Sequence, residues 1–366
     1  LMSRVELRSV SKRYPKADDL AVKQISFEIP DGELVVILGP SGCGKTTTLR
    51  MLAGLEGVTS GEILFDGKPV QDTPPAARNI AMAFENYGLY EQWDVFDNIA
   101  YPLRLRSVPD AQIESSVTGI ASGLGIADYL GQRPGALSGG VRQRIGLARA
   151  LVRDPSVFLL DEPMSHVDAD GRNDMRLEIR RIHERTGATM VIVTHDQEDA
   201  LMMADRILIM NEGGIEQYDT PRQIYDAPAT AFVAGFVGEP PMNILSVSRS
   251  GDSLDGAGFA ASIPYGLDAA LVPGRQLVAF RPHLTRIVSG PAAGAAGALV
   301  LTGQVYMVEP FGERTIVTVQ VGQTRVKVES RAQESYDLDS VVSLLVRTED
   351  LHVFADPAGS GRGERF

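Results

Sequence analysis

The chain has 366 residues, more than one hydrophobic core usually organises, so we expect two domains. Hydrophobic residues make up 44% and charged residues 22%, as in ordinary soluble globular proteins. The 35 basic and 47 acidic side chains give a formal net charge of -12, which argues against a nucleic-acid-binding protein. A single cysteine excludes a disulfide framework, and no apolar run approaches the roughly 18 residues of a transmembrane helix. We therefore expect a cytoplasmic protein that reaches a membrane only through partners.

The N-terminal part of the chain alternates between strand and helix patterns. Residues Ile25 to Ile29 place their apolar side chains on one face of a predicted strand. Leu34 to Leu38 is a continuous apolar run, which is typical of a strand covered on both faces. A glycine-rich loop, a helix and a strand at Glu62 to Phe65 follow. This order indicates an α/β domain.

The middle of the chain, from about 86 to 137, is predicted to be mainly helical. A second α/β section begins at Ser138. Its predicted strands are Val157 to Leu160, Met190 to Val193 and Ile207 to Met210, and a helix is predicted at Asp174 to Arg185. Alternating strands and helices predict a mostly parallel sheet covered on both sides.

The character of the chain changes after residue 238. Gly238-Glu239-Pro240-Pro241 interrupts the α/β pattern, and short alternating strands follow, such as Val300 to Val308 and Thr315 to Val321. We predict an α/β domain over residues 1–238 and an all-β barrel or sandwich over residues 239–366.

A phosphate-binding loop is predicted between the strand at Leu34 to Leu38 and the helix after it. The motif G-x-x-x-x-G-K-T is complete: Gly39, Pro40, Ser41, Gly42, Cys43, Gly44, Lys45 and Thr46. Backbone N–H groups of such a loop point at anionic phosphates, and glycines let the backbone approach closely. Lys45 is predicted to bind the β- and γ-phosphates, and the Thr46 hydroxyl to bind Mg²⁺.

Two carboxylates follow the apolar run Val157 to Leu160, at the carboxyl edge where α/β sheets bind ligands. Asp161 is predicted to hold Mg²⁺ directly or through water. Glu162 is predicted to act as the general base that polarises the attacking water.

Ser138, Gly139 and Gly140 begin a predicted helix and form a second candidate anion site. One chain does not need two γ-phosphate sites so far apart. Both sites are needed in a dimer that holds ATP between the phosphate loop of one subunit and the serine helix of the other.

The order of these motifs resembles the ATP-binding cassette (ABC) ATPases over residues 3 to 238. The motifs that carry the resemblance are the phosphate loop, Glu85-Asn86-Tyr87, Leu137-Ser138-Gly139-Gly140, Asp161-Glu162-Pro163, Ser165-His166-Val167-Asp168 and Thr194-His195-Asp196. The tail, with Phe280-Arg281-Pro282, resembles the regulatory domain of carbohydrate-importer ATPases, which implies an OB-like β-barrel. The family implies a P-loop NTPase fold with a helical subdomain at about 86–137.

The resemblance also implies roles for individual residues. Tyr14 would stack on adenine with Val22 nearby, and Thr47 would join the nucleotide-binding set. His195 would contact the γ-phosphate and help to hold the water, which makes His195, Glu162 and Lys45 the catalytic group. Asp168 would organise the dimer interface. The predicted Mg²⁺ ligands are Thr46, Asp161 and Glu85.

Two positions depart from the family pattern. Glu85 and Val141 occupy positions where the family has glutamine. A carboxylate at Glu85 still binds Mg²⁺ but adds a negative charge and loses an N–H donor. Either these changes are tolerated drift, or the chain works beside a second, non-identical ATPase with unequal ATP sites.

The resemblance implies an ATPase motor subunit of an ABC importer for a sugar, polyol or related solute, with ATP and Mg²⁺ bound. Its expected partners are transmembrane permease subunits, contacted through residues 85–105, a second ATPase subunit, and indirectly an extracellular solute-binding protein. We expect it at the cytoplasmic face of the cell membrane. The alternatives are an importer ATPase for polyamine, sulfate or iron, and a soluble cassette ATPase acting on nucleic acid.

Overall fold

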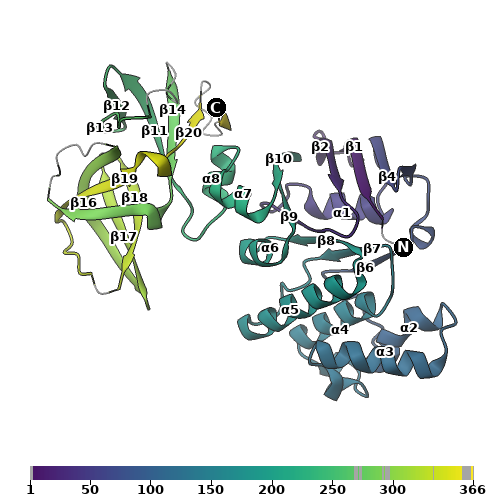
Figure 1. The fold of residues 1–366 in the computed structure, drawn as a ribbon. Coiled ribbons are helices and arrows are strands. Elements are labelled where there is room, and N and C mark those ends of the chain that lie inside the picture. Colours follow the sequence, from purple (N-terminus) through teal and green to yellow (C-terminus); the bar gives the residue numbers. More distant parts are fainter. Residues whose placement is uncertain are drawn as a thin grey trace. The chain divides into compact units, whose positions relative to one another are not determined.

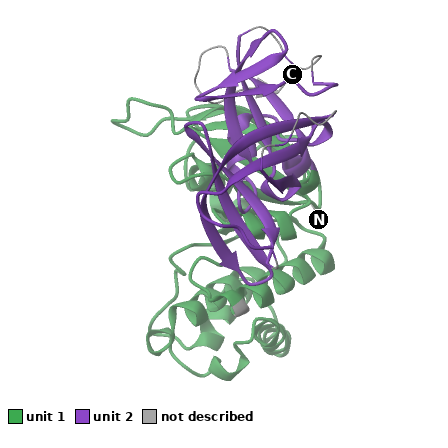
Figure 2. Cartoon of the chain, turned by 90° about the vertical axis from the view of Figure 1, so that its left-hand side faces the viewer, with its two compact units in different colours: residues 1–222 green, residues 223–366 purple. Residues whose placement is uncertain are grey.

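The computed structural model describes residues 3–267, 271, 274–290, 292, 297–332, 334–356 and 364–365. The chain forms two compact units, Leu1–Arg222 and Gln223–Phe366 (Figure 2). The division falls earlier than the predicted boundary at residue 238. The reason is helix α8 (Ala231–Phe236), whose Ala231 and Ala234 share a small apolar core with Leu277 and Phe354 of the second unit.

The central sheet of unit 1 has six strands in the order β10-β9-β3-β8-β7-β6. All neighbours are parallel except β10, which pairs antiparallel with β9. The strands are β3 (Leu34–Leu38), β6 (Ile80–Ala83), β7 (Val157–Asp161), β8 (Thr189–Thr194), β9 (Arg206–Asn211) and β10 (Gly214–Asp219). Every residue of β3, β7 and β8 is buried, which confirms the sheet predicted from their apolar runs.

A separate antiparallel sheet has the order β2-β1-β4-β5. Its strands are β1 (Val5–Lys12), β2 (Val22–Ile29), β4 (Ser60–Phe65) and β5 (Lys68–Pro69). Along β2 the side chains of Ile25, Phe27 and Ile29 are buried and those of Ser26 and Glu28 exposed, as the alternation predicted. Helix α1 packs between this sheet and the parallel one, because residues of all three share one apolar core (Figure 1).

The helices of unit 1 are α1 (Lys45–Ala53), α2 (Val95–Arg104), α3 (Asp110–Gly123), α4 (Gly139–Leu151), α5 (Ala169–Thr186) and α6 (Gln197–Met203). Short 3-10 helices occupy Pro75–Ala77, Ala127–Tyr129 and Pro134–Ala136. The predicted helical segment is therefore confirmed as α2, α3 and short turns. Asp94, Ser138 and Asp168 cap α2, α4 and α5 by accepting a hydrogen bond from a first-turn N–H.

Unit 2 begins within α7 (Pro221–Asp226) and continues through α8 into two antiparallel sheets. The six-stranded sheet contains β11 (Asn243–Ser250), β12 (Ser253–Gly256), β13 (Phe259–Ser262), β14 (Arg275–Phe280), β20 (His352–Ala355) and β21 (Glu364–Arg365). The five-stranded sheet contains β15 (Thr285–Ser289), β16 (Ala298–Phe311), β17 (Arg314–Val321), β18 (Thr324–Arg331) and β19 (Val341–Arg347). Short 3-10 helices occupy Pro282–Leu284 and Thr348–Asp350. The all-β class is confirmed, and the edge strands β15 and β18 contact each other, as in a closed barrel.

Candidate active site

The phosphate loop connects β3 to α1 and requires glycine at two tightly packed positions. A Cβ atom at Gly39 would lie 2.2 Å from the carbonyl oxygen of Met210. A Cβ atom at Gly44 would lie 2.7 Å from the carbonyl oxygen of Ala21, and Gly44 has a φ of 106°. Only glycine fits both places without moving backbone atoms.

The Lys45 side chain lies within this loop. Its Nζ donates hydrogen bonds to the carbonyl oxygens of Gly39, at 2.7 Å, and Pro40, at 3.0 Å. Lys45 is buried, so its charge is held in a fixed position beside the loop backbone. Cys43 is buried too, and burial raises the pKa of its thiol. The cysteine side chain therefore packs in the apolar core beneath the loop.

Thr46 and Asp161 meet across the gap between α1 and the end of β7. The Thr46 hydroxyl donates to Oδ1 of Asp161 at 3.1 Å. Asp161 is 2% exposed, and burial raises the pKa of its carboxyl group against the opposing effect of the Thr46 hydrogen bond. The nearby charge of Glu85, which follows β6, also raises the pKa of Asp161. The structure thus brings the three predicted metal ligands to one edge of the sheet.

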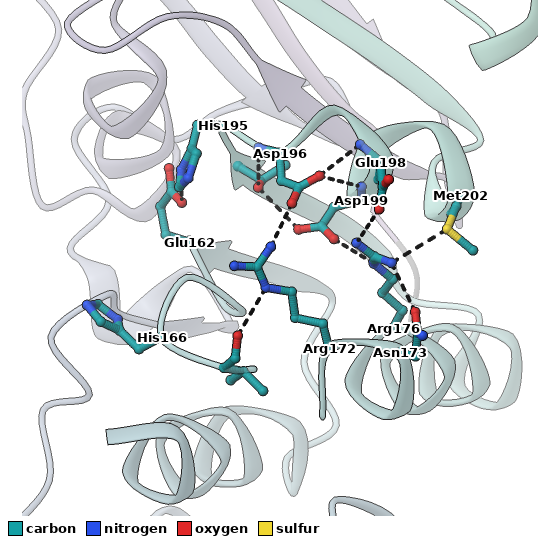
Figure 3. Close-up of polar contacts among 12 residues, drawn as sticks. Glu162, His166, Arg172, Asn173, Arg176, His195, Asp196, Glu198, Asp199 and Met202 are labelled. Atoms are coloured by element: carbon teal, nitrogen blue, oxygen red, sulfur yellow. Dashed lines mark hydrogen bonds and ion pairs between the residues drawn. The ribbon is translucent and has the colours of Figure 1, made fainter. Parts of the chain in front are cut away.

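Glu162 and His195 face each other at the ends of β7 and β8 (Figure 3). Oε2 of Glu162 lies 2.7 Å from Nδ1 of His195. The side chain of Glu162 is 14% exposed and that of His195 62%. Burial raises the pKa of the Glu162 carboxyl group, and the His195 contact acts in the opposite direction. A carboxylate with a raised pKa beside a solvent-facing imidazole is suited to accept a proton from water.

Gln143 holds the backbone of Glu162, a role that the sequence analysis missed. Its Nε2 donates to the carbonyl oxygen of Glu162 at 2.8 Å, and its Oε1 accepts from the N–H of His166 at 2.8 Å. Glu162 has a φ of 49°, a left-handed conformation that costs energy for a non-glycine residue and needs such support. The available signal was a glutamine on the buried face of α4, together with Ile145.

Two ion pairs hold the segment that follows β8 (Figure 3). Arg172 on α5 contacts Asp196 at 2.8 Å, and Arg176 contacts Asp199 at 2.6 Å. The N–H of Asp196 also donates to the Thr194 hydroxyl at 3.0 Å. These contacts fix the start of α6 and hence the position of His195. These ion pairs were not predicted, because the sequence of α5 does not indicate which acidic residue each of its arginines contacts.

Arg149 near the end of α4 fixes the segment after Glu85. Its guanidinium donates to the carbonyl oxygens of Gly88, at 2.5 Å, and Tyr87, at 3.2 Å. Burial lowers the pKa of Arg149. The departure from the family pattern at Glu85 thus lies on a segment whose backbone is tied to α4.

Tyr14, Val22 and Thr47 lie beside the phosphate loop. The Tyr14 hydroxyl is 3.2 Å from the Thr47 hydroxyl, and Nζ of Lys12 lies 5.0 Å from the centroid of the Tyr14 ring. Val22 is fully buried against Gly44. Its side chain supports the loop, and its contact with adenine stays a prediction.

Ser138 and Asp168 serve as helix caps within the chain. Oγ of Ser138 accepts from the N–H of Val141 at 3.4 Å, and Oδ1 of Asp168 accepts from the N–H of Gly171 at 2.8 Å. Among the described residues, Ser138 to Gly140 make no hydrogen bond to the phosphate loop. Their contact with an ATP molecule held by a second cassette stays a prediction.

Comparisons with known proteins agree with this arrangement. The ABC transporter family matches residues 22–165. The sn-glycerol-3-phosphate import ATP-binding protein UgpC of Cupriavidus metallidurans is 41% identical over 98% of this chain and 98% of its own length. The protein of the same name from Jannaschia sp. is 49% identical over 72% of this chain and 75% of its own. The dimeric structure of the ATP-binding cassette MJ0796 bound to ADP and Pi superposes with a TM-score of 0.56 and 27% identity, over 60% of this chain and 99% of that one.

The fold of unit 1, the phosphate loop and the adjacent carboxylates define an ATP-binding cassette ATPase. The chain belongs to the family of import ATP-binding proteins of ABC transporters. It is the ATP-hydrolysing subunit of an importer, which confirms the main functional prediction over a soluble cassette acting on nucleic acid. Among the described residues, no helix has the length and apolar character needed to cross a membrane.

Proposed function

We propose that the chain hydrolyses MgATP in a pair of cassettes to import glycerol phosphate or a related polyol or sugar. The solute class is supported by the names of the relatives, which cover nearly the whole chain. The observation that carries the catalytic part is the contact between Glu162 and His195 beside Lys45 and Asp161.

Glu162 acts as the general base in this proposal. Burial raises the pKa of Glu162, which makes its carboxylate a stronger base and favours proton transfer from water. His195 contacts the same carboxylate and exposes its other face to solvent, where the γ-phosphate would lie. Gln143 and the ion pairs of α5 keep both groups in place. Catalysis then depends on positioning and on charge stabilisation.

Lys45 and the oxygens of Thr46 and Asp161 provide the electrostatic part. The buried ammonium group of Lys45 donates to two carbonyl oxygens. When ATP binds, a phosphate oxygen can replace one of these acceptors, so the ammonium group keeps its hydrogen bonds. The hydroxyl and carboxylate 3.1 Å apart are hard oxygen ligands of the kind Mg²⁺ prefers. Among the described residues no cluster of three His, Cys, Asp or Glu could hold a metal by itself. Thr46 and Asp161 would hold Mg²⁺, which would supply positive charge against the phosphates.

A second cassette completes the site. Ser138 caps α4 through the N–H of Val141, and the N–H groups of Gly139 and Gly140, as first-turn groups without an intrahelical acceptor, can bind an anion. Asp168 caps α5 in the same way. We assign Ser138, Gly139 and Gly140 to the ATP held by the partner's phosphate loop. The second cassette is either another copy of this chain or a non-identical ATPase.

An apolar groove in unit 1 is the proposed docking site of a permease. It has a volume of about 530 Å³ and is lined by Leu55, Met82, Phe84 and Leu105. Leu55, Phe84 and Leu105 are 47%, 38% and 67% exposed, which is unusual for such side chains side by side. Its lining residues Phe84 and Leu105 stand at the two ends of the segment 85–105. The groove suits an amphipathic helix of a membrane subunit. In this proposal the chain works at the cytoplasmic face of the membrane.

Reconstitution with the permease subunits and the solute-binding protein tests the solute. Proteoliposomes would receive the binding protein loaded with sn-glycerol 3-phosphate, maltose, a polyamine or sulfate, and ATP hydrolysis would be measured. We expect stimulation by glycerol phosphate or another polyol or sugar. Stimulation by polyamine or sulfate alone would contradict the proposal.

A further inference from the structure

A second cavity in unit 1 lies away from the nucleotide site. It has a volume of about 550 Å³ and is bordered by α2, α3 and the carboxyl-terminal ends of α4 and α5. These four helices lie together in one part of unit 1 (Figure 1). None of the residues that line the cavity belongs to the phosphate loop or to the edge with Asp161 and Glu162. The volume is that of an ordinary small-molecule site.

Three arginines from three different segments line this cavity. Arg106 follows α2, Arg153 follows α4, and Arg185 lies in the last turn of α5. Asp154 is the only acidic residue among the lining residues that the structure describes. The lining thus has three arginines, of which Arg106 and Arg185 are exposed and Arg153 is half-buried, against one aspartate.

The arginines lack acidic partners within the described part of the chain. Arg153 and Arg185 form no ion pair or hydrogen bond there, and Arg106 donates only a long bond of 3.4 Å to the carbonyl oxygen of Pro102. The Nε atom of Arg153 is buried without any acceptor. Burial and the charge of Arg106 lower the pKa of Arg153 to about 10. The half-buried cation of Arg153 and the repulsion from the exposed Arg106 both cost energy, which an anion bound in the cavity would offset.

Two buried arginines of unit 1 have partners within the chain. Arg176 contacts Asp199 at 2.6 Å, and Arg78 donates to the carbonyl oxygens of Met51 and Leu52, both at 2.9 Å. The Nε atom of Arg153 has no such partner among the described residues, as is also true of Arg142 and Arg144, but Arg153 is the one of these three that lines the cavity. Three neutral polar side chains on α3 also line this cavity and can form hydrogen bonds: Gln112, Ser115 and Ser116.

We propose that this cavity binds a small phosphorylated molecule through Arg106, Arg153 and Arg185. Guanidinium groups bind phosphate oxygens in paired hydrogen bonds, and the hydroxyls of Ser115 and Ser116 can donate to the remaining oxygens. The apolar side chains of Leu103 and Leu151 in the same lining suit the carbon skeleton of a phosphate ester. The cavity shares no lining residue with the phosphate loop or with the edge that carries Asp161 and Glu162.

Equilibrium dialysis of the full chain with radiolabelled inorganic phosphate tests the proposal. A saturating non-hydrolysable ATP analogue with Mg²⁺ would first fill the nucleotide site. We expect one further equivalent of phosphate per chain. Arg153→Gln and Arg185→Gln should each weaken this binding at least about 10-fold, as expected for the loss of one charge-assisted interaction. A parallel titration with sn-glycerol 3-phosphate distinguishes free phosphate from an ester, which should bind more tightly if the apolar side chains contribute.

Arg181→Gln is the matched control. Arg181 lies on the same helix as Arg185 and is exposed like it, but it is not part of the cavity lining. It should leave phosphate binding unchanged. An equal loss in Arg181→Gln would assign the effect to net charge and overturn the proposal. The absence of any phosphate beyond the nucleotide site would overturn it too.

Thermal unfolding gives a second readout that does not depend on activity. In phosphate-free buffer, Arg153→Gln should unfold at a higher temperature than the unmodified chain, because it removes a partly buried cation without a partner. Phosphate should raise the unfolding temperature of the unmodified chain but not that of Arg153→Gln. A lower unfolding temperature for Arg153→Gln in phosphate-free buffer would show that the guanidinium stabilises the fold and would contradict the proposal.

Discussion

Buried charges serve different purposes in the two units. In unit 1, Asp161 and Glu162 lie at the carboxyl edge of the parallel sheet, where burial raises the pKa of each carboxyl group. In unit 2, the guanidinium of Arg281 is also buried, and burial lowers its pKa. Arg281, however, donates to the backbone carbonyl oxygens of Val237 and Tyr225 and lies 3.9 Å from the centroid of the Tyr225 ring.

The difference lies in the partners. The partners of Arg281 are backbone carbonyls and an aromatic ring that folding fixes in place. Among the described residues, the carboxylates of Asp161 and Glu162 make their side-chain hydrogen bonds to Thr46 and His195, side chains that can rotate. A buried charge with a fixed set of partners stabilises the fold, whereas one with an exchangeable partner is available for chemistry. Substitutions of the buried carboxylates should therefore affect activity, and substitutions of Arg281 should affect stability.

The largest expected effect is the loss of ATP hydrolysis in Glu162→Gln. The amide keeps the shape of the side chain but cannot accept a proton, so the turnover rate should fall at least about 100-fold. ATP binding, measured by equilibrium dialysis, should remain. Glu198→Gln is the control, because the Glu198 side chain is 67% exposed and contacts Arg176 only at 3.6 Å. Turnover of Glu162→Gln close to that of the control would remove Glu162 from the role of base.

Arg281→Ala should affect stability rather than chemistry. It leaves the carbonyl oxygens of Val237 and Tyr225 buried without donors, so the free energy of unfolding should fall by about 2–4 kcal/mol. Scanning calorimetry should show the change. ATP affinity should be unaffected, and exposed Arg286→Ala serves as the control for lost charge. Unchanged stability of Arg281→Ala would refute the structural role of this arginine.

Gln143→Ala should lower turnover with little effect on the KM for ATP. The substitution frees the carbonyl oxygen of Glu162 and the N–H of His166, so the base is held less firmly. A loss of about 10-fold in kcat is expected from such misplacement. Exposed Gln132→Ala provides a matched change outside the site. A rise in KM without a fall in kcat would indicate that Gln143 acts on nucleotide binding instead.

The smallest expected effect is a shift in the pH profile of Glu85→Gln. The negative charge of Glu85 raises the pKa of Glu162, so its removal should lower that pKa. The base would then stay deprotonated to lower pH, and the acidic limb of the kcat profile should move toward lower pH. Exposed Glu91→Gln should leave the limb in place. Movement toward higher pH in Glu85→Gln would contradict the assigned direction.

The sequence predicts those parts of the molecule in which local pattern decides structure. The apolar runs of β3, β7 and β8 predict buried parallel strands, and the complete phosphate motif predicts the loop before α1. The separate antiparallel sheet was not predicted, since periodicity shows which face of β2 is buried but not which strand pairs with it.

The supporting contacts of the site could not be read from sequence either. Gln143 and Glu162 are joined through a backbone carbonyl, which carries no side-chain signature. The pair of Arg176 and Asp199 joins α5 to α6 across 23 positions of sequence. Helix α8 joined unit 2 for a similar reason, because its small alanines gave no indication of the sheet they pack on.

Cross-linking between two cassettes tests the central claim most directly. Two variants would be made in a Cys43→Ser, Glu162→Gln background, one carrying Ser41→Cys in the phosphate loop and the other Ser138→Cys at the start of α4. Because each variant has one cysteine, a disulfide that joins the two different variants reports only contact between chains. We expect this mixed disulfide in the presence of MgATP and little of it without nucleotide. If it does not form at saturating ATP, Ser138 does not face the phosphate loop of a second cassette, and the account of a shared ATP site is wrong.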